Sequence, residues 1–178
     1  MNAILNSELL KNIQVKTIDR YEFVKQVSNW IDMRSTSNFQ TSWLVQRVED
    51  FENRHSDLSF LEQLKKVISD IESRILFYEI CYCFLDSPNK NAEIDRTLAD
   101  IYSDARKRFA MGRLLMEKQH LLQTRELIEF KQAHFLSRAG LTLTETGQKL
   151  FLEEDSILFQ KQKNNSELLI LPDKIAYK

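Results

Sequence analysis

The chain has 178 residues, enough for one domain with a sizeable hydrophobic core. Apolar residues make up 43% of it and charged residues 29%, a balance that excludes an intrinsically disordered protein. The net charge of −1 argues against a protein held on nucleic acid or acidic lipid by its overall charge, although it is compatible with a local basic patch.

The cysteines and the start of the chain bear on the cellular compartment. Cys81 and Cys83 stand two positions apart, so on a helix they point to nearly opposite sides and cannot form a disulfide. Two cysteines without a disulfide framework are typical of a reducing compartment. The first eight residues lack the basic and apolar regions of a signal peptide, and no apolar run approaches the length of a membrane span. We therefore expect a cytoplasmic protein without membrane association.

Glycine and proline are scarce, and neither occurs between Met1 and Ser87. These residues interrupt secondary structure most strongly, so their scarcity predicts long helices. A short helix is expected from Ser7 to about Val15. The pair Asp19 and Glu22 has the spacing of a capping box and predicts the start of a second helix. A third helix is expected to start at Ser37 and to end near His55.

The best-defined expected element covers residues 59–86. Its apolar residues alternate three and four positions apart over nearly four heptads, the pattern of a helix–helix seam. They are Leu61, Leu64, Ile68, Ile71, Ile75, Tyr78, Tyr82 and Leu85. Polar residues and Pro88 then predict a turn.

A very long helical segment is expected from Ala92 to about Arg138, with Gly112 as a kink and Gly140 just beyond its end. Thr142 is expected to start a further helix, and residues 164–178 to form a polar, extended tail that includes a short apolar run. The predicted fold is all-α. It is a single domain over residues 1–178, an elongated bundle built on a long antiparallel hairpin of 59–86 with 92–138 and flanked by short terminal helices.

The second half of the long segment carries a broad apolar stripe. Leu114, Leu121, Ile128 and Phe135 recur every seven residues, with Leu115, Leu122 and Leu136 beside them. Such a stripe is too wide for one helix–helix contact and would protrude beyond its partner helix. It favours our first functional hypothesis, a non-enzymatic interaction or regulatory protein that acts as a homodimer or as a subunit of a larger complex.

Two Glu-x-x-His pairs suggest a metal site as one alternative. Glu52 with His55, and Glu117 with His120, each place both side chains on one helix face. Together with Glu22 and Glu79 they stand in an order that is similar to the ligand order of ferritin-like di-metal proteins. The resemblance implies a carboxylate-bridged di-metal oxidase, whereas the polar surroundings of both pairs are typical of solvated helix surface and argue against it.

A basic strip suggests nucleic-acid binding as the other alternative. Arg106 and Arg113 share a helix face, and Lys107 lies beside Arg106. Further on, Leu143-Thr144-Glu145-Thr146-Gly147 followed by Leu150 resembles the close of a bacterial winged-helix domain, in which this motif starts the last helix. The resemblance implies a nucleic-acid-associated regulator. It also implies short helices and a hairpin upstream, where the periodicity predicts one long helix.

No arrangement typical of a serine or cysteine nucleophile, a phosphate-binding glycine loop or a zinc site occurs in the sequence. We therefore lean against an enzyme and expect no cofactor. A protein partner or a second copy of the chain is the expected partner, with nucleic acid as the alternative.

Overall fold

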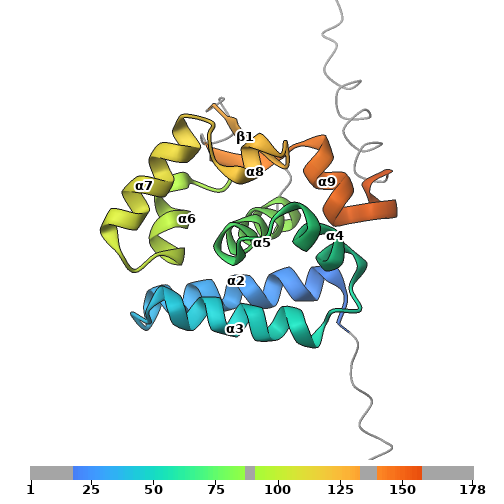
Figure 1. The fold of residues 1–178 in the computed structure, drawn as a ribbon, viewed down its shortest axis with the longest axis horizontal. Helices are drawn as coiled ribbons and strands as arrows, with labels where there is room; N and C mark the ends of the chain where they lie inside the picture. Colours follow the sequence, from blue (N-terminus) through green and yellow to red (C-terminus); the bar gives the residue numbers. More distant parts are fainter. Residues whose placement is uncertain (1–17, 87–90, 133–139, 158–178) are drawn as a thin grey trace, which may run out of the picture.

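The computed structural model describes residues 18–86, 91–132 and 140–157. They form a mainly helical structure (Figure 1), which confirms the all-α class. In chain order the helices are α2 (Arg20–Thr36), α3 (Thr41–Arg54), α4 (Ser59–Val67), α5 (Ile71–Asp86), α6 (Ile94–Ile101), α7 (Ala105–Met116), α8 (Leu121–Thr124) and α9 (Glu145–Leu152), and α9 continues into a 3-10 turn, η1 (Glu153–Asp155). The strands β1 (Ile128–Lys131) and β2 (Gly140–Leu143) form a hairpin between α8 and α9.

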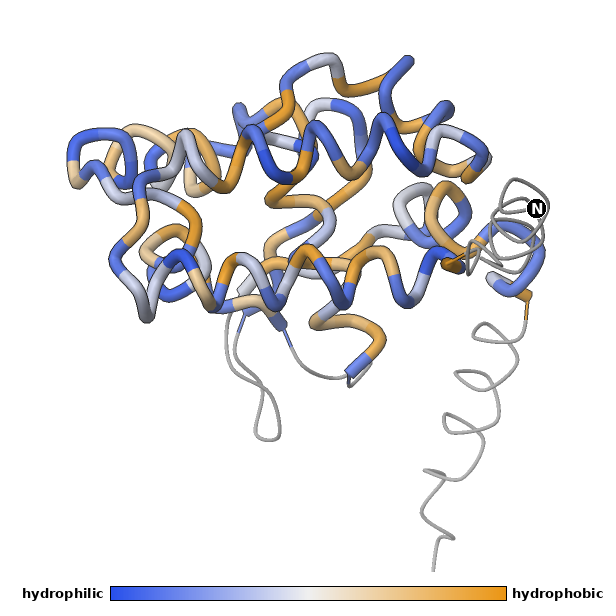
Figure 2. The backbone as a smooth tube through the Cα atoms, turned by 90° about the horizontal axis from the view of Figure 1, so that it is seen from below, coloured by the Kyte–Doolittle hydropathy of each residue, from blue (hydrophilic) through white to orange (hydrophobic). Residues whose placement is uncertain are grey.

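The centre of the fold is α5. Its side chains are buried from Ser73 to Tyr78 and again at Ile80, Cys81 and Phe84. Figure 1 shows α5 in the middle, with α2 and α3 together below it, α6 and α7 to its left and α9 to its right. Polar and apolar residues alternate along the helices (Figure 2), so each outer helix gives one face to the core and one to solvent.

The N-terminal helices follow the sequence pattern closely. Asp19 caps α2, and its carboxylate accepts a hydrogen bond of 2.7 Å from the backbone N–H of Glu22. The helix ends at Thr36, with Ser37 as its C-cap. The next helix, α3, runs from Thr41 to Arg54 and ends near His55 as expected, but it does not start at Ser37, which belongs to the end of α2. The expected helix at 7–15 and the tail at 164–178 lie outside the described residues.

The expected helix over 59–86 is in fact two helices, α4 and α5, separated by residues 68–70. The seam residues Leu64, Ile68, Ile75 and Tyr78 are fully buried, as expected, but they do not belong to one continuous helix. The break has a local cause, because the Asp70 carboxylate accepts a 2.8 Å hydrogen bond from the N–H of Ser73 and caps α5. A capping aspartate therefore starts a new helix inside an unbroken heptad pattern.

The expected long helix over 92–138 is also wrong. The described part of this segment forms α6, α7, α8 and β1. Asp104 caps α7 by accepting a 2.9 Å hydrogen bond from the N–H of Lys107. Lys118 and Glu126 adopt left-handed φ values of 57° and 56° directly after α7 and α8, which ends each helix without a glycine. Gly112 lies inside α7, so the predicted kink is replaced by a true break eight residues earlier.

The hairpin gains a third partner from the segment before α6. In the antiparallel register of β1 with β2, Phe130 pairs with Leu141. Leu141 also forms a bridge with Ala92, through two backbone hydrogen bonds of 2.8 Å. A side chain on Gly140 would place its Cβ 2.5 Å from the Ala92 carbonyl oxygen, so this close approach requires glycine. Gly140 therefore belongs to a strand rather than to a helix end.

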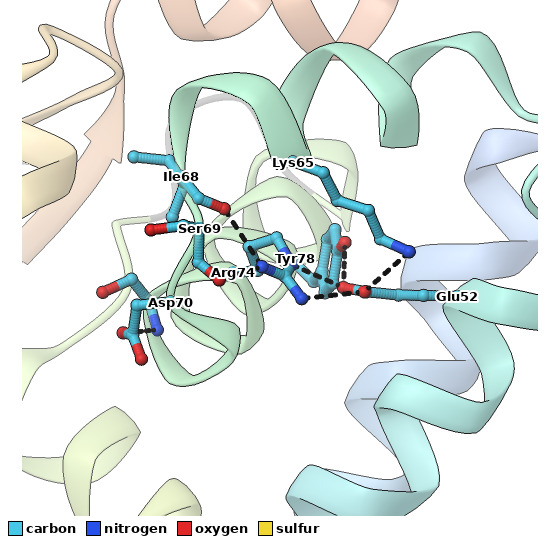
Figure 3. A network of polar contacts seen from close by, with 8 residues as sticks. Glu52, Lys65, Ile68, Ser69, Asp70, Arg74 and Tyr78 are labelled. Carbon is cyan, nitrogen blue, oxygen red and sulfur yellow. Dashed lines mark hydrogen bonds and ion pairs between the residues drawn. The ribbon is translucent and has the colours of Figure 1, made fainter.

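A buried ion pair joins α3, α4 and α5 (Figure 3). The Arg74 guanidinium donates hydrogen bonds of 2.8 and 2.9 Å to the two oxygens of the Glu52 carboxylate. Glu52 also accepts a 2.7 Å hydrogen bond from the Tyr78 hydroxyl and lies 3.2 Å from the Lys65 ammonium. Burial and the adjacent carboxylate raise the pKa of Tyr78 well above its usual value, so the hydroxyl keeps its proton and remains a donor.

Replacing Glu52 tests whether this pair holds the three helices. We expect Glu52→Leu to lower the free energy of unfolding by about 3–5 kcal/mol, because Arg74 would stay buried without a counter-charge. Chemical denaturation in urea measures the change. The matched control is Glu62→Ala, which removes an exposed carboxylate paired with Lys66 and should cost less than about 1 kcal/mol. Equal losses in the two variants would contradict the assigned role of Glu52.

Candidate nucleic-acid interface

Two consecutive helices form a helix-turn-helix. α6 and α7 are joined by the three residues Tyr102, Ser103 and Asp104, a connection of the length found in that motif. Tyr102 is fully buried and fixes the turn against the core. The N–H of Ser103 donates a 2.9 Å hydrogen bond to the Thr41 hydroxyl at the start of α3. The turn is therefore anchored on its inner side.

The first helix of the motif is held at its C-terminal end by Arg34 of α2. This buried guanidinium donates hydrogen bonds to the backbone carbonyls of Ala99 and Asp100. The Ser35 hydroxyl donates a 2.9 Å hydrogen bond to the Asp100 carboxylate beside it. A cation at the last carbonyls of a helix interacts favourably with the negative end of the helix dipole. These contacts fix α6, and through the short turn they fix the start of α7.

The second helix, α7, is the most exposed part of this arrangement. All twelve of its residues are described, and Leu115 is the one that is buried. Its sequence contains four basic residues and no acidic one. Arg106 and Arg113, seven positions apart, share the outward face with the small Ala110 between them, and all three are exposed. This face combines positive charge with room for close approach.

The predicted basic strip does not act as one unit, because Lys107 faces the protein. Its ammonium lies 2.5 Å from a Glu72 carboxylate oxygen on α5 and 5.5 Å from the centre of the Tyr102 ring. Within the described ranges, neither Arg106 nor Arg113 forms an ion pair with another side chain. Two of the three predicted contact residues are therefore available to a ligand, and the third is engaged.

The elements around α7 have the order of a winged helix-turn-helix domain. After α5 come the bridge at Ala92, the helices α6 and α7, the short α8 and the β1–β2 hairpin, and α9 follows. In Figure 1, α6, α7 and β1 are neighbours at one end of the molecule. The short helices and the hairpin that the resemblance implied are thus present where the sequence predicted one long helix.

The motif that carries the resemblance has a local structural role. The Thr144 hydroxyl accepts a 3.1 Å hydrogen bond from the N–H of Gly147 and caps α9. The N–H of Thr144 donates to the carbonyl of Leu127, 3.1 Å away. A Cβ on Gly147 would come within 2.0 Å of the same carbonyl oxygen, so a larger residue does not fit. Thr144 and Gly147 together fix α9 against the strand that precedes the hairpin turn.

The predicted interaction stripe is not a continuous exposed surface. Leu115, Leu122 and Ile128 are buried in the core of the chain itself, on α7, α8 and β1 respectively. Leu114 and Leu121 are half-buried. Phe135 and Leu136 lie outside the described residues. Three of the seven predicted stripe residues therefore pack within the chain, on three different elements.

The predicted metal ligands do not come together. Both oxygens of Glu52 are engaged by Arg74, and the His55 ring packs edge-on against Phe51 with centroids 4.6 Å apart. Glu117 is exposed whereas His120 is buried, so the second pair does not share a surface. The other two predicted ligands, Glu22 and Glu79, are exposed and half-buried respectively. Among the described residues, no three side chains of His, Cys, Asp or Glu are placed to hold a metal ion.

The surface features that the sequence interpretation missed are apolar. Phe109 and Met116, at the edge of the cationic face of α7, are 81% and 63% exposed. Both line a groove of about 940 Å³ formed by α6, α7 and β1. The residue that could have revealed this groove is Asp104. A capping aspartate after an apolar run predicts that a new helix starts there, and the residues that follow would then face in different directions from those of one continuous helix.

Comparisons with protein-family models, with curated proteins and with solved structures find no match to this chain. In the part of the chain that the structure describes, none of the helices is long and apolar enough to cross a membrane.

His120 links α7 to the hairpin through an unusual cap. It is 2% exposed, and its Nδ1 accepts a 3.2 Å hydrogen bond from the N–H of Leu122, which caps α8. Nδ1 must therefore be unprotonated, which puts the proton of the neutral ring on Nε2. Burial lowers the pKa of His120 from its ordinary value, against the opposing effect of Asp70.

We expect His120 to make the fold sensitive to acid. Because its folded-state pKa is lowered, the stabilisation is complete above the unfolded value of 6.5 and is lost as the pH falls from there through the folded pKa. In His120→Asn the side-chain oxygen still caps α8 but does not titrate. Urea unfolding at pH 7.5 and 5.5 should show a smaller loss of stability for the variant than for the wild type. Equal losses would contradict this role.

Proposed function

We propose that this protein binds duplex DNA and that α7 is the helix that enters the major groove. The observation that carries the proposal is the exposed face of α7, which is the second helix of a helix-turn-helix and carries Arg106 and Arg113 without acidic residues. In such motifs the second helix lies in the major groove while the first crosses the backbone. The proposal takes up the nucleic-acid alternative from the sequence and replaces the exposed-stripe hypothesis.

The dimensions favour B-form DNA. A helix with its side chains is about 10–12 Å across, which matches a major groove about 12 Å wide. Arg106 and Arg113 are separated by about 10.5 Å along the helix axis, or roughly three base-pair steps. Both can therefore reach bases or phosphates in one groove, and the small side chain of Ala110 lets the backbone approach. The major groove of A-form RNA is too deep and narrow for this contact.

The charge distribution predicts the character of the binding. With a net charge of −1, the chain gains little attraction from its surface as a whole, so the affinity must come from a few local cations. Each phosphate that is neutralised releases counterions, and the logarithm of the binding constant falls with the logarithm of salt concentration by about 0.9 per phosphate. A shallow salt dependence, corresponding to a few contacts, is expected.

The test is fluorescence anisotropy with labelled duplexes of about 20 base pairs, at several salt concentrations. We expect the double variant Arg106→Ala, Arg113→Ala to bind at least about tenfold more weakly than the wild type, since two charge-assisted contacts are lost. The slope of the logarithm of the binding constant against the logarithm of salt concentration should fall in magnitude by about 1 for each arginine that contacts a phosphate.

The matched control removes the same charge elsewhere, in Lys25→Ala, Lys66→Ala. Both side chains are exposed, on α2 and α4, away from the helix-turn-helix. The control should retain the wild-type affinity. An equal loss in the control, or no binding by the wild type at low salt, would contradict the proposal.

A further inference from the structure

A second groove, of about 570 Å³, is formed by α2 and α3, which lie on the side of the molecule opposite to α8 and β1 (Figure 1). Trp30 and Phe51 line it and are 6% and 7% exposed, so they form its floor. Their rings contact each other edge to face, with centroids 4.9 Å apart. The amides of Gln26 and Asn29 line the α2 side. An apolar floor with a few polar groups around it is the composition of a ligand-binding site.

The rim of this groove is cationic. Lys25 of α2 and the two arginines Arg47 and Arg54 of α3 line it, and all three side chains are exposed. In the part of the chain that the structure describes, none of the three forms an ion pair with a carboxylate. Glu22 is the one acidic residue among the described residues of the lining. On a chain with a net charge of −1, this local excess of positive charge favours a negatively charged ligand.

Arg47 is held in place by two indole rings. Its guanidinium carbon lies 4.9 Å from the centre of the Trp30 ring and 5.4 Å from that of Trp43, within the range of a cation–π interaction. Trp43 in turn packs against Phe39, with ring centroids 4.5 Å apart. A guanidinium on an aromatic face keeps the N–H donors in its own plane available, and their fork matches the two oxygens of a carboxylate. Arg47 is therefore positioned to bind a carboxylate from outside the chain.

The same contacts favour a peptide over a nucleic acid. Single-stranded nucleic acid binds where its bases can stack on exposed aromatic faces. Trp30 and Phe51 are almost fully buried, and Arg47 already lies over the Trp30 indole, so these rings position the cation and leave no face for a base. The side-chain amides of Gln26 and Asn29 match a peptide backbone, which both donates and accepts hydrogen bonds, whereas a phosphodiester group only accepts them.

We propose that the α2–α3 groove binds a short acidic segment of another protein, with one of its carboxylates on Arg47 and an adjacent apolar side chain on the floor of Trp30 and Phe51. Arg47 and Arg54 are separated by about 10.5 Å along α3, a distance that an extended chain spans with about three residues. The recognised segment is therefore a short linear motif in which acidic residues flank one apolar anchor. This contact is separate from the face of α7 and does not depend on the proposed function.

The test selects the ligand from random seven-residue peptides displayed on phage, with the full chain as bait, and then measures binding of the enriched peptides after synthesis. Both tryptophans of the chain contact Arg47, so their fluorescence reports on this site. We expect the enriched peptides to combine Asp or Glu with an aromatic or aliphatic residue and to change the tryptophan emission on binding. Replacing their carboxylates by amides should weaken binding at least about tenfold.

Variants at Arg47 assign the contact. Arg47→Ala should bind the selected peptides at least about tenfold more weakly, and Arg47→Lys should recover only part of the loss, because lysine keeps the charge but not the planar fork. Arg47 is exposed, so both variants should fold, which circular dichroism checks. The matched control is the double variant Arg106→Ala, Arg113→Ala, which removes exposed arginines from α7 and should bind the peptides like the wild type.

Three outcomes would overturn the proposal: a selection that enriches no acidic motif, peptides that bind Arg47→Ala as tightly as the wild type, or binding that leaves the tryptophan emission unchanged. Titration with a seven-nucleotide oligothymidine tests the other class of ligand. If it changes the emission in an Arg47-dependent manner and no peptide does, the groove binds nucleic acid and the proposal is wrong. In the duplex anisotropy assay Arg47→Ala should retain the wild-type affinity, so a failure of DNA binding and a failure of peptide binding are distinguishable.

Discussion

The arrangement of the helices depends on the contacts of the buried Arg74 guanidinium. Besides its two hydrogen bonds to Glu52 of α3, it donates to the carbonyls of Ile68 and Ser69, at 3.0 and 2.7 Å, where α4 has ended and α5 has not begun. A buried charge is costly unless it is paired and its donors are satisfied. In this arrangement of α3, α4 and α5 the Arg74 side chain bonds to α3 and to the break at once, and so it ties the start of the central helix to both.

The exposed end of the molecule follows from that direction. Once α5 is fixed, Arg34 and Thr41 hold α6 and the turn from the α2–α3 side, and the bridge at Ala92 holds the segment that precedes α6. α7 is then attached at its capped start and at Leu115, and most of its surface is left to solvent. A helix that is rigidly positioned but contributes little to its own core is suited to binding a partner.

Local sequence patterns predict the helical class and the buried residues better than they predict where one helix ends and the next begins. The all-α class, the cap at Asp19 and the burial of Leu64, Ile68 and Ile75 all follow from local patterns that the structure confirms. The breaks between helices do not follow from these patterns, because the scarcity of glycine and proline predicted continuous helices. Instead, α2, α5 and α7 begin at capping aspartates, and α7 and α8 end before ordinary residues with left-handed φ, Lys118 and Glu126; neither feature disturbs a heptad count.

The candidate site was predictable only in part, for a related reason. Arg106 and Arg113 stand out as a basic pair at helical spacing, and the threonine–glycine motif indicates the corner after the hairpin. The engagement of Lys107 by Glu72 and the exposure of Phe109 depend on where α5 and α6 lie. Arg74 and Arg34 help to hold those helices, and their partners on other helices, Glu52 for Arg74 and Ala99 and Asp100 for Arg34, are distant in sequence and leave no local pattern.

The central claim, that α7 is the surface that meets duplex DNA, can be tested directly by following backbone amide resonances during titration with a duplex of about 20 base pairs. Binding by a recognition helix should shift the amides of residues 104–117 most, with smaller shifts in β1 and little change in α2 and α3. DNA binding that leaves α7 unshifted, or that shifts the amides around Trp43 and Arg47 of α3 instead, would contradict it.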